Sequence, residues 1–414
     1  MANKNILKKY LQNRSAEEIF LHGDSTFNAD IIVVIPSYWE PKLFQTLESL
    51  KQCASPKSKV AVMVILNYSK DSEEIINFHN NQYKQLMDWQ SYSSNPSLQF
   101  IFSQPIYLQS KQAGVGLARK IGMDMAVRLF SHHNKSSGII LCLDADCLCH
   151  ENYLVEVERY FSNPNSKPCV TLGFEHQFDE NETAIIEYEL HLRYYIEAQK
   201  SIGYPFAFHT LGSCMAVRAE AYCLQGGMNK RQAGEDFYFL HKFSVIDWLG
   251  KIKKNLVYPS ARISTRVPFG TGKAVGDYLQ NKIQLTYSLD AIRLFGLLLD
   301  KMNDWYIKTN DDIREDIKNL NNDVFHFCDQ QELWKQILVC KENCATLESF
   351  HKRMMRWFDP FLLMKFLHYL RDFGYPDTDV SSACRSFLKI KPESAISSKE
   401  LLMMFRHLQN EHQK

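Results

Sequence analysis

The chain has 414 residues, which is enough for one large domain with a smaller one, or for two domains. Its hydrophobic content of 45% and its charged content of 23% are ordinary for a globular protein and exclude wholesale disorder. The formal net charge of +1 excludes a global electrostatic attraction to nucleic acid or to acidic membranes, so an anionic ligand has to be bound by a local cluster of side chains.

The first two thirds of the chain alternate between predicted strands and predicted helices. Residues 1–29 are polar and favour a helical lead-in segment. Apolar, β-branched runs that end in polar residues or proline predict buried parallel strands, at residues 31–36, 60–66, 98–102 and 138–143. Helical spacing and polar helix-forming stretches predict helices between them, at residues 41–53, 72–89 and 116–130.

This alternation predicts an α/β fold with a mainly parallel sheet. In such sheets, ligands bind at the carboxyl ends of the strands. Three segments follow predicted strand ends and are therefore expected to converge on one edge of the sheet. They are Pro36-Ser37-Tyr38, Asn67-Tyr68 and Asp144-Ala145-Asp146.

The last third of the chain differs in character, because helical apolar periodicity dominates beyond about residue 276. We expect a main domain over residues 30–275 and a helical C-terminal region over residues 276–414. The polar N-terminus and the lack of an uncharged apolar run of about 18 residues predict neither a secretory leader nor a transmembrane helix. Together with scattered cysteines, this favours a cytoplasmic location, with peripheral contact at the inner membrane face left open.

The Asp144-Ala145-Asp146 element carries the clearest chemical signal. Two carboxylates at the end of a buried strand can present oxygens to a hard divalent cation, which in turn can bridge the phosphates of a nucleoside diphosphate. The alternative is a strand-to-loop turn whose acids face water, and the buried strand leading into the acids favours the site. Cys147, Cys149 and His150 follow, but they lack a second ligand pair for zinc, so packing and capping roles are expected.

Four segments resemble inverting family-2 glycosyltransferases, which have the GT-A fold. Residues 31–40 (IIVVIPSYWE) resemble the opening strand of that family, and residues 111–120 (KQAGVGLARK) are similar to the Gly-rich segment that borders base and ribose. Residues 143–146 (LDAD) match the metal-binding motif. Residues 226–229 (GGMN) followed by 234–236 (GED) match the acceptor-side block. The four elements occur in the expected order over roughly residues 30–270, which makes the resemblance specific.

The resemblance implies transfer of one sugar, with inversion, from a UDP or GDP sugar to a hydroxyl acceptor. It implies Mn or Mg bound by Asp146, with Asp144 contacting the metal or the ribose, and Asp236 as the general base. Glu235 would orient the acceptor or cap the next helix; an ordinary helix N-terminus with two acids is the alternative for this pair. The residues expected to contact the nucleotide are Pro36, Ser37, Tyr38, Glu40, Asn67, Lys111, Gly114, Arg119, Asp144, Ala145 and Arg266.

Several positions depart from the family pattern or have two interpretations. Asn67 stands where the family commonly has an Asp that touches the base, so the base is left open between uracil and guanine. The Gln-x-x-Arg-Trp motif of processive members is not evident, which favours a non-processive enzyme. Arg262 and Arg266 belong to a basic Gly-rich segment that either closes over the diphosphate or links to the helical region. His209 or His241 is a third metal ligand, an acceptor contact or a structural residue.

Three other functions compete with this interpretation. A sugar-phosphate nucleotidyltransferase should have a Gly-rich loop with an arginine after the first strand, whereas residues 36–40 contain no glycine. An inactive binding protein of the same fold is disfavoured by the intact Asp144, Asp146 and Asp236. A retaining transferase stays open. The acceptor, whether glycan, lipid or small molecule, is not determined, and no nucleic acid partner is expected.

Overall fold

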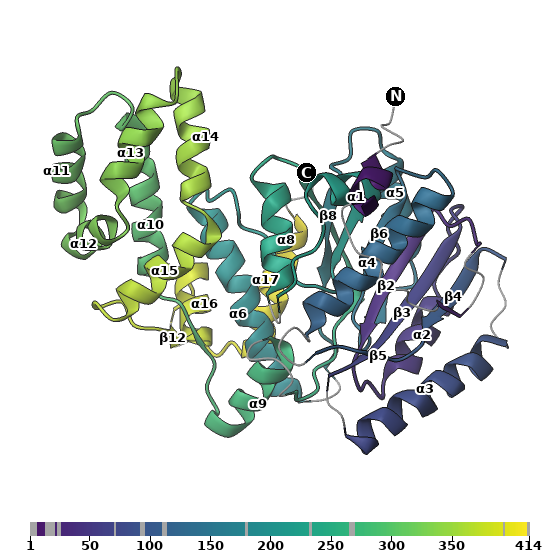
Figure 1. Cartoon of the computed structure of the whole chain (residues 1–414). Helices are drawn as coiled ribbons and strands as arrows, with labels where there is room; N and C mark the ends of the chain where they lie inside the picture. The colour runs from purple at the N-terminus through teal and green to yellow at the C-terminus, as the bar shows by residue number, and fades with distance from the viewer. Residues whose placement is uncertain are drawn as a thin grey trace. The chain divides into compact units, whose positions relative to one another are not determined.

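The computed structural model (Figure 1) describes residues 6–12, 21–22, 26–69, 72–91, 96–109, 114–178, 181–231, 234–264, 270–391 and 394–411. The chain forms two compact units. The first consists of Met1–Glu182 and Thr210–Gly276, and the second of Thr183–His209 and Asp277–Lys414. This division differs from the sequence-based boundaries because residues 183–209 group with the C-terminal helices.

The first unit is built on one large mixed sheet. Its strands β4, β3, β2 and β6 run parallel to one another, and β10 runs parallel to β8. β9 is antiparallel to both β6 and β8, so it is one reversed strand between neighbours that run in the same direction. In spatial order the strands are β1 (Leu21–His22), β4 (Leu98–Ser103), β3 (Val60–Tyr68), β2 (Ile31–Ser37), β6 (Ile139–Cys142), β9 (Met215–Arg218), β8 (Cys169–Phe174), β10 (Leu249–Tyr258) and β7 (Leu148–Cys149).

The composition of the central strands explains their position. Every residue of β2 is buried, as is β3 up to Asn67, because their apolar runs are covered on both faces. The short strand β5 (Ile106–Tyr107) pairs with the end of β3. The prediction of an α/β fold with a mainly parallel central sheet is confirmed.

The predicted strand end at Pro36 is wrong by one residue, since β2 pairs with β3 through Ser37. The Val34 carbonyl accepts a hydrogen bond from Leu143 N at 3.1 Å, so the backbone groups of Val34 face β6. Residues two apart in a strand face the same neighbour, which places the N–H that Pro36 lacks on the β6 side. Pairing with β6 ends at Val34, so the proline removes no ladder bond.

Helices cover the sheet of the first unit, and α4 is the one that positions the site (Figure 1). A Cβ added at Gly122 of α4 would lie 2.4 Å from a Val34 methyl and 3.0 Å from Ile65, so glycine allows this helix to rest directly on β2 and β3. The helices of this unit are α1 (Ile6–Gln12), α2 (Leu43–Lys51), α3 (Glu73–Ser91), α4 (Val115–His132), α5 (Tyr153–Ser162), α7 (Ala219–Leu224) and α8 (Glu235–Ser244).

The second unit is helical apart from a two-stranded ribbon, β11 (Leu285–Thr286) with β12 (Thr378–Asp379). A capping residue fixes the start of α15 in this unit: the Asp359 side chain accepts from Leu362 N at 2.8 Å, with Pro360 at the first helical position. The helices are α6 (Glu182–Ser201), α10 (Leu289–Lys301), α11 (Asn310–Leu320), α12 (Asn322–Gln330), α13 (Leu333–Glu342), α14 (Leu347–Trp357), α15 (Pro360–Arg371), α16 (Val380–Leu388) and α17 (Ser398–Glu411), while α9 (Thr271–Asn281) spans the unit boundary.

A buried ion-pair cluster fastens α17 to α6. The Glu189 carboxylate, which is fully buried, accepts from Arg193 Nε at 2.7 Å and from Arg406 at 2.7 and 2.8 Å. Arg193 also donates to Gln409 of α17, a contact between the same two helices.

Replacing Arg406 with Gln is expected to lower the free energy of unfolding by roughly 2 kcal/mol, because Glu189 loses two charge-assisted hydrogen bonds. Urea denaturation followed by circular dichroism measures the change. The matched control is Arg356→Gln on the exposed side of α14, for which no loss is expected. Equal stability of the two variants would contradict the role given to the cluster.

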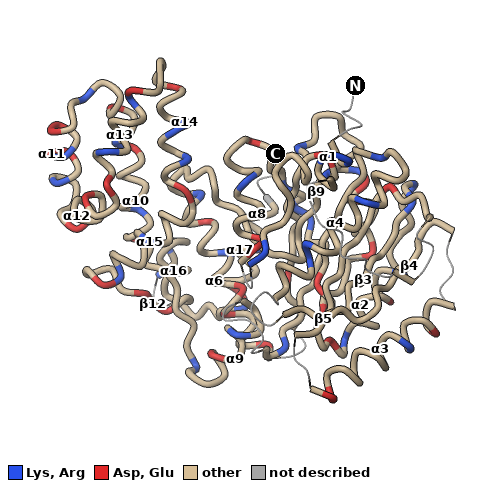
Figure 2. Tube along the Cα trace, viewed as in Figure 1, with Lys and Arg blue, Asp and Glu red and all other residues tan. Residues whose placement is uncertain are grey.

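Charged residues of both signs are spread along the described chain (Figure 2). Figure 2 shows Lys and Arg interspersed with Asp and Glu in both units. In the ranges that the structure describes, no helix is long and apolar enough to cross a membrane.

Candidate functional site

The Asp144-Ala145-Asp146 segment follows β6 directly and is held from two sides. Leu143 donates its N–H to the Val34 carbonyl of β2, and the Thr46 hydroxyl of α2 donates to the Ala145 carbonyl at 2.9 Å. Ala145 is buried, whereas Asp144 and Asp146 are partly exposed. The segment is therefore fixed through its backbone, and both carboxylates reach the surface of the strand edge.

Arg119 of α4 joins the Asp-Ala-Asp segment to α8. This residue is only 1% exposed, and its guanidinium donates to Asp144 Oδ1 at 2.6 Å through Nη2 and to Glu235 Oε1 through Nη1. A Cβ added at Gly212 would lie 2.5 Å from this guanidinium, so the glycine backbone forms one wall of the arginine's site. Asp144 and Glu235, which lie far apart in the sequence, thus bind the same buried guanidinium.

Gly116 lies in the Gly-rich segment singled out in the sequence, and packing accounts for it without a phosphate. A Cβ at this position would lie 2.3 Å from the Arg231 carbonyl oxygen and 3.0 Å from Glu235 Cβ. The first turn of α4 therefore approaches the chain that leads into α8 more closely than any other residue type permits.

α8 begins with the two acids of the predicted acceptor-side block. Gly234 precedes it in the left-handed conformation, with φ of 72°. Glu235 is buried against Arg119, while the Asp236 carboxylate accepts from Phe237 N at 2.7 Å. Burial raises the pKa of Asp236 above its ordinary value, and Arg119 together with the Phe237 amide opposes this rise.

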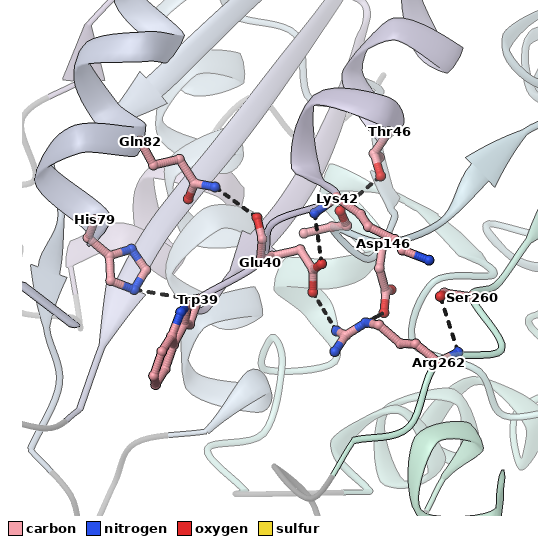
Figure 3. Close-up of polar contacts among 10 residues, drawn as sticks. Trp39, Glu40, Lys42, Thr46, His79, Gln82, Asp146, Ser260 and Arg262 are labelled. Atoms are coloured by element: carbon pink, nitrogen blue, oxygen red, sulfur yellow. Dashed lines mark hydrogen bonds and ion pairs between the residues drawn. The ribbon is translucent and has the colours of Figure 1, made fainter. Parts of the chain in front are cut away.

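A second arginine clamps the other acid of the segment (Figure 3). Arg262, which follows β10, donates from Nε to Asp146 Oδ2 at 2.9 Å and from Nη2 to Glu40 Oε2. Burial raises the pKa of Asp146 to about 6, and the charge of Arg262 opposes the rise. Each acid of the Asp-Ala-Asp segment is thus paired with a different arginine.

Of the two carboxylates that Arg262 contacts, Glu40 is the more buried and also accepts a backbone hydrogen bond. It is 2% exposed, and its Oε1 accepts from Lys42 N at 3.0 Å. The Gln82 side chain of α3 donates to the Glu40 carbonyl at 2.8 Å, and Trp39 donates its N–H to His79 Nε2 at 3.3 Å (Figure 3). Residues of α3 therefore shape the loop after β2.

Replacing Asp146 with Asn is expected to raise the free energy of unfolding by about 1–2 kcal/mol at pH 8, and by much less at pH 4. Folding raises the pKa of Asp146 from 3.8 to about 6, so between these values the folded protein holds a proton that the unfolded chain has released. Stability due to this group therefore falls as the pH rises through this window and stays lower above it. The magnitude is discounted because 24% of the side chain is exposed.

Urea denaturation at the two pH values, without cation or nucleotide, measures this difference. Asp247→Asn, at a side chain that is 88% exposed, controls for the loss of a surface carboxylate. An Asp146→Asn variant that is less stable than the wild type at pH 8 would refute the assignment.

The remaining residues predicted to contact a nucleotide lie around the ends of β2 and β3. Pro36 and Ser37 are the last residues of β2, and Tyr38 follows half-buried. Asn67 is buried, and its Nδ2 donates to the Ser37 carbonyl at 3.0 Å and the Ile65 carbonyl at 3.2 Å. Gly114 directly precedes α4 with extended backbone. Lys111 and Arg266 lie outside the described residues.

A cation at this site would rely on two carboxylates. Within the described residues, no group of three or more His, Cys, Asp or Glu side chains is placed to hold a metal ion. Asp144 Oδ2 and Asp146 Oδ1 take no hydrogen bond from the described part of the chain. Because Mg is commonly held by one or two carboxylates plus substrate phosphates, these two oxygens fit a cation that arrives with a nucleotide.

The two histidines considered as metal ligands have other surroundings. His241 lies in α8, where its Nδ1 is 3.4 Å from the Ser244 hydroxyl, and His209 belongs to the second unit. Of the residues after the Asp-Ala-Asp segment, Cys147 is buried and His150 Nδ1 accepts from Asn152 N at 3.0 Å, just before α5.

Sequence patterns did not single out several residues that shape the site. Gln82 and His79 lie on the buried side of a helix that looks polar in sequence, and a buried polar stripe on such a helix is the signal that could have found them. Gly212 and the pairing of Arg262 with Glu40 carry no local signal, because their partners lie 93 and 222 residues away.

No family model matches the chain, and a comparison with curated proteins found no match. Among solved structures, S. aureus TarS 1–349 is similar over 56% of this chain and 60% of its own, with 14% identity and a TM-score of 0.35. S. aureus TarS 1–349 in complex with UDP-GlcNAc matches over 79% and 90%, with 12% identity and a TM-score of 0.39. The mannosyltransferase PcManGT from Pyrobaculum calidifontis, in complex with GDP-Man and Mn²⁺, matches over 99% and 94%, with 12% identity and a TM-score of 0.37. Likenesses this distant carry no conclusion about activity.

Proposed function

We propose that the chain is a non-processive glycosyltransferase of the GT-A fold that resembles inverting family 2. It transfers a sugar from a UDP or GDP sugar to a hydroxyl acceptor. The observation that carries the proposal is the bridge that buried Arg119 makes between Asp144 and Glu235. This bridge gathers the acids at the end of β6 and the acids that begin α8 into one site, which is what a donor-side and an acceptor-side group require.

On the donor side, Asp144 Oδ2 and Asp146 Oδ1 are the oxygens that would hold Mn or Mg. Such a cation, when bound, neutralises the charge that builds up on a leaving nucleoside diphosphate. The nucleotide contacts are assigned to Pro36, Ser37, Tyr38, Glu40, Asn67, Lys111, Gly114, Arg119, Ala145 and Arg266, in addition to Asp144.

On the acceptor side, Asp236 is assigned as the general base. A carboxylate that removes the acceptor proton works best when its pKa is closer to neutrality than that of a free Asp, and burial shifts Asp236 in that direction. The α8 N-terminus limits this shift, since its amides favour the ionised form. Glu235 positions this end of α8 through Arg119.

Isothermal titration with UDP and GDP sugars, with and without Mn²⁺, tests the proposal. Metal-dependent binding of one of them is expected, and the absence of any nucleotide-sugar binding would refute it. Incubation of the bound donor with candidate hydroxyl acceptors, followed by NMR of the product, reads the anomeric configuration. Retention would indicate a retaining transferase, binding without turnover an inactive fold member, and synthesis of a nucleotide sugar from a sugar phosphate a nucleotidyltransferase.

A further inference from the structure

Arg262 donates to Oδ2 of Asp146, the carboxylate whose other oxygen, Oδ1, would hold a cation (Figure 3). Its guanidinium spans two carboxylates, Asp146 and Glu40, and about a fifth of its side chain is exposed. The single positive charge of Arg262 thus pairs with two carboxylates. A divalent cation that ligates Asp146 would place a second cation beside this guanidinium, and like charges at such short range repel strongly.

The two arginines of the site differ in their freedom to move. Arg119 has only 2% of its side chain exposed and is held by buried Glu235 as well as by Asp144. Arg262 is tenfold more exposed, with 20% of its side chain accessible, and it follows the last residues of β10 rather than lying in a helix packed on the sheet. An exchange of partners is therefore easier at Arg262 than at Arg119.

A nucleoside diphosphate provides what this exchange needs. Its phosphate oxygens are anionic and match the planar fork of a guanidinium as well as carboxylates do. They also complete the shell of a cation that two carboxylate oxygens hold only in part. A bound diphosphate can therefore replace Asp146 as a partner of the Arg262 guanidinium, and its phosphate oxygens can at the same time ligate the cation.

We propose that Arg262 and the divalent cation compete for Asp146, so that the cation binds weakly to the free protein and tightly only together with a nucleoside diphosphate. This inference rests on the proposed function for the identity of the nucleotide. The competition itself is a property of the free protein, since it concerns Arg262, Asp146 and Glu40 alone.

Electron paramagnetic resonance of free Mn²⁺ tests the competition directly. Without nucleotide, Arg262→Gln is expected to bind Mn²⁺ at least about tenfold more tightly than the wild type, because Asp146 is released and one positive charge is removed. Adding UDP or GDP is expected to tighten Mn²⁺ binding of the wild type by a similar factor and that of the variant far less. Arg128→Gln, at an exposed position of α4, is the control and should match the wild type.

The single variant leaves Glu40 buried without its arginine, which can impair folding. The double variant Glu40→Gln with Arg262→Gln removes both charges, keeps an oxygen to accept from Lys42 N, and is expected to show the same gain in Mn²⁺ affinity. Equal Mn²⁺ affinities of wild type and both variants, or no Mn²⁺ binding by any of them, would overturn the inference. Failure of UDP and GDP to bind the wild type would instead count against the proposed function, and the nucleotide-free titration would still decide this inference.

Discussion

Replacing Asp236 with Asn is expected to lower kcat by about 10³-fold and to change donor affinity by no more than about twofold. The amide keeps an oxygen that can accept from Phe237 N, so the start of α8 is preserved. It cannot take a proton from an attacking hydroxyl, so the chemical step is lost. Product formation measures kcat, and isothermal titration with the donor measures affinity.

Asp146→Ala is the informative counterpart, because it removes a carboxylate that the proposal places on the donor side. It should weaken metal-dependent donor binding, whereas Asp236→Asn should not. Asp247→Asn, at an exposed acid of the same unit, should leave both quantities unchanged. If the Asp146 and Asp236 variants lost donor binding equally, the division between a donor side and a base would be wrong.

Replacing Arg119 with Gln is expected to lower the free energy of unfolding by about 3–5 kcal/mol. Glu235, at 2% exposure, would lose the guanidinium that compensates it, and removing one partner of a buried ion pair is strongly destabilising. Arg119→Lys should recover only part of the loss, because an ammonium cannot reach Asp144 and Glu235 through one planar fork. Urea denaturation of the variants gives these values.

A double variant separates the charge effect from simple damage to the core. Arg119→Met with Glu235→Met removes both buried charges; Asp144 then loses its hydrogen bond from Arg119, and Asp236 loses a nearby positive charge. With 37% of its side chain exposed, Asp144 can be hydrated, so the double variant should be more stable than Arg119→Gln. Arg128→Gln on the same helix controls for loss of a surface charge. A double variant less stable than the single one would show that packing, not charge pairing, dominates at Arg119.

The parallel strands could be predicted because each is a short apolar run, and those of β2 and β3 are rich in β-branched residues and buried on both faces. Their ends were less predictable. Whether Pro36 stops β2 depends on how far β6 pairs alongside it, which is a property of the neighbouring strand. The grouping of α6 with the C-terminal helices also depends on distant partners, such as Arg406 for Glu189.

The sequence by itself determined which acids stand at the end of β6 and at the start of α8, because a buried strand and a helix start are local patterns. Only the tertiary structure decided which arginine pairs with each acid. Arg119 serves Asp144 and Glu235, 25 and 116 residues away, and Arg262 serves Asp146, 116 residues away. The physical reason is range. An ion pair forms only when its charged groups come within a few ångströms. The packing of α4 on β2 and the course of the chain after β10 bring these groups together. Local sequence periodicity does not encode that long-range arrangement.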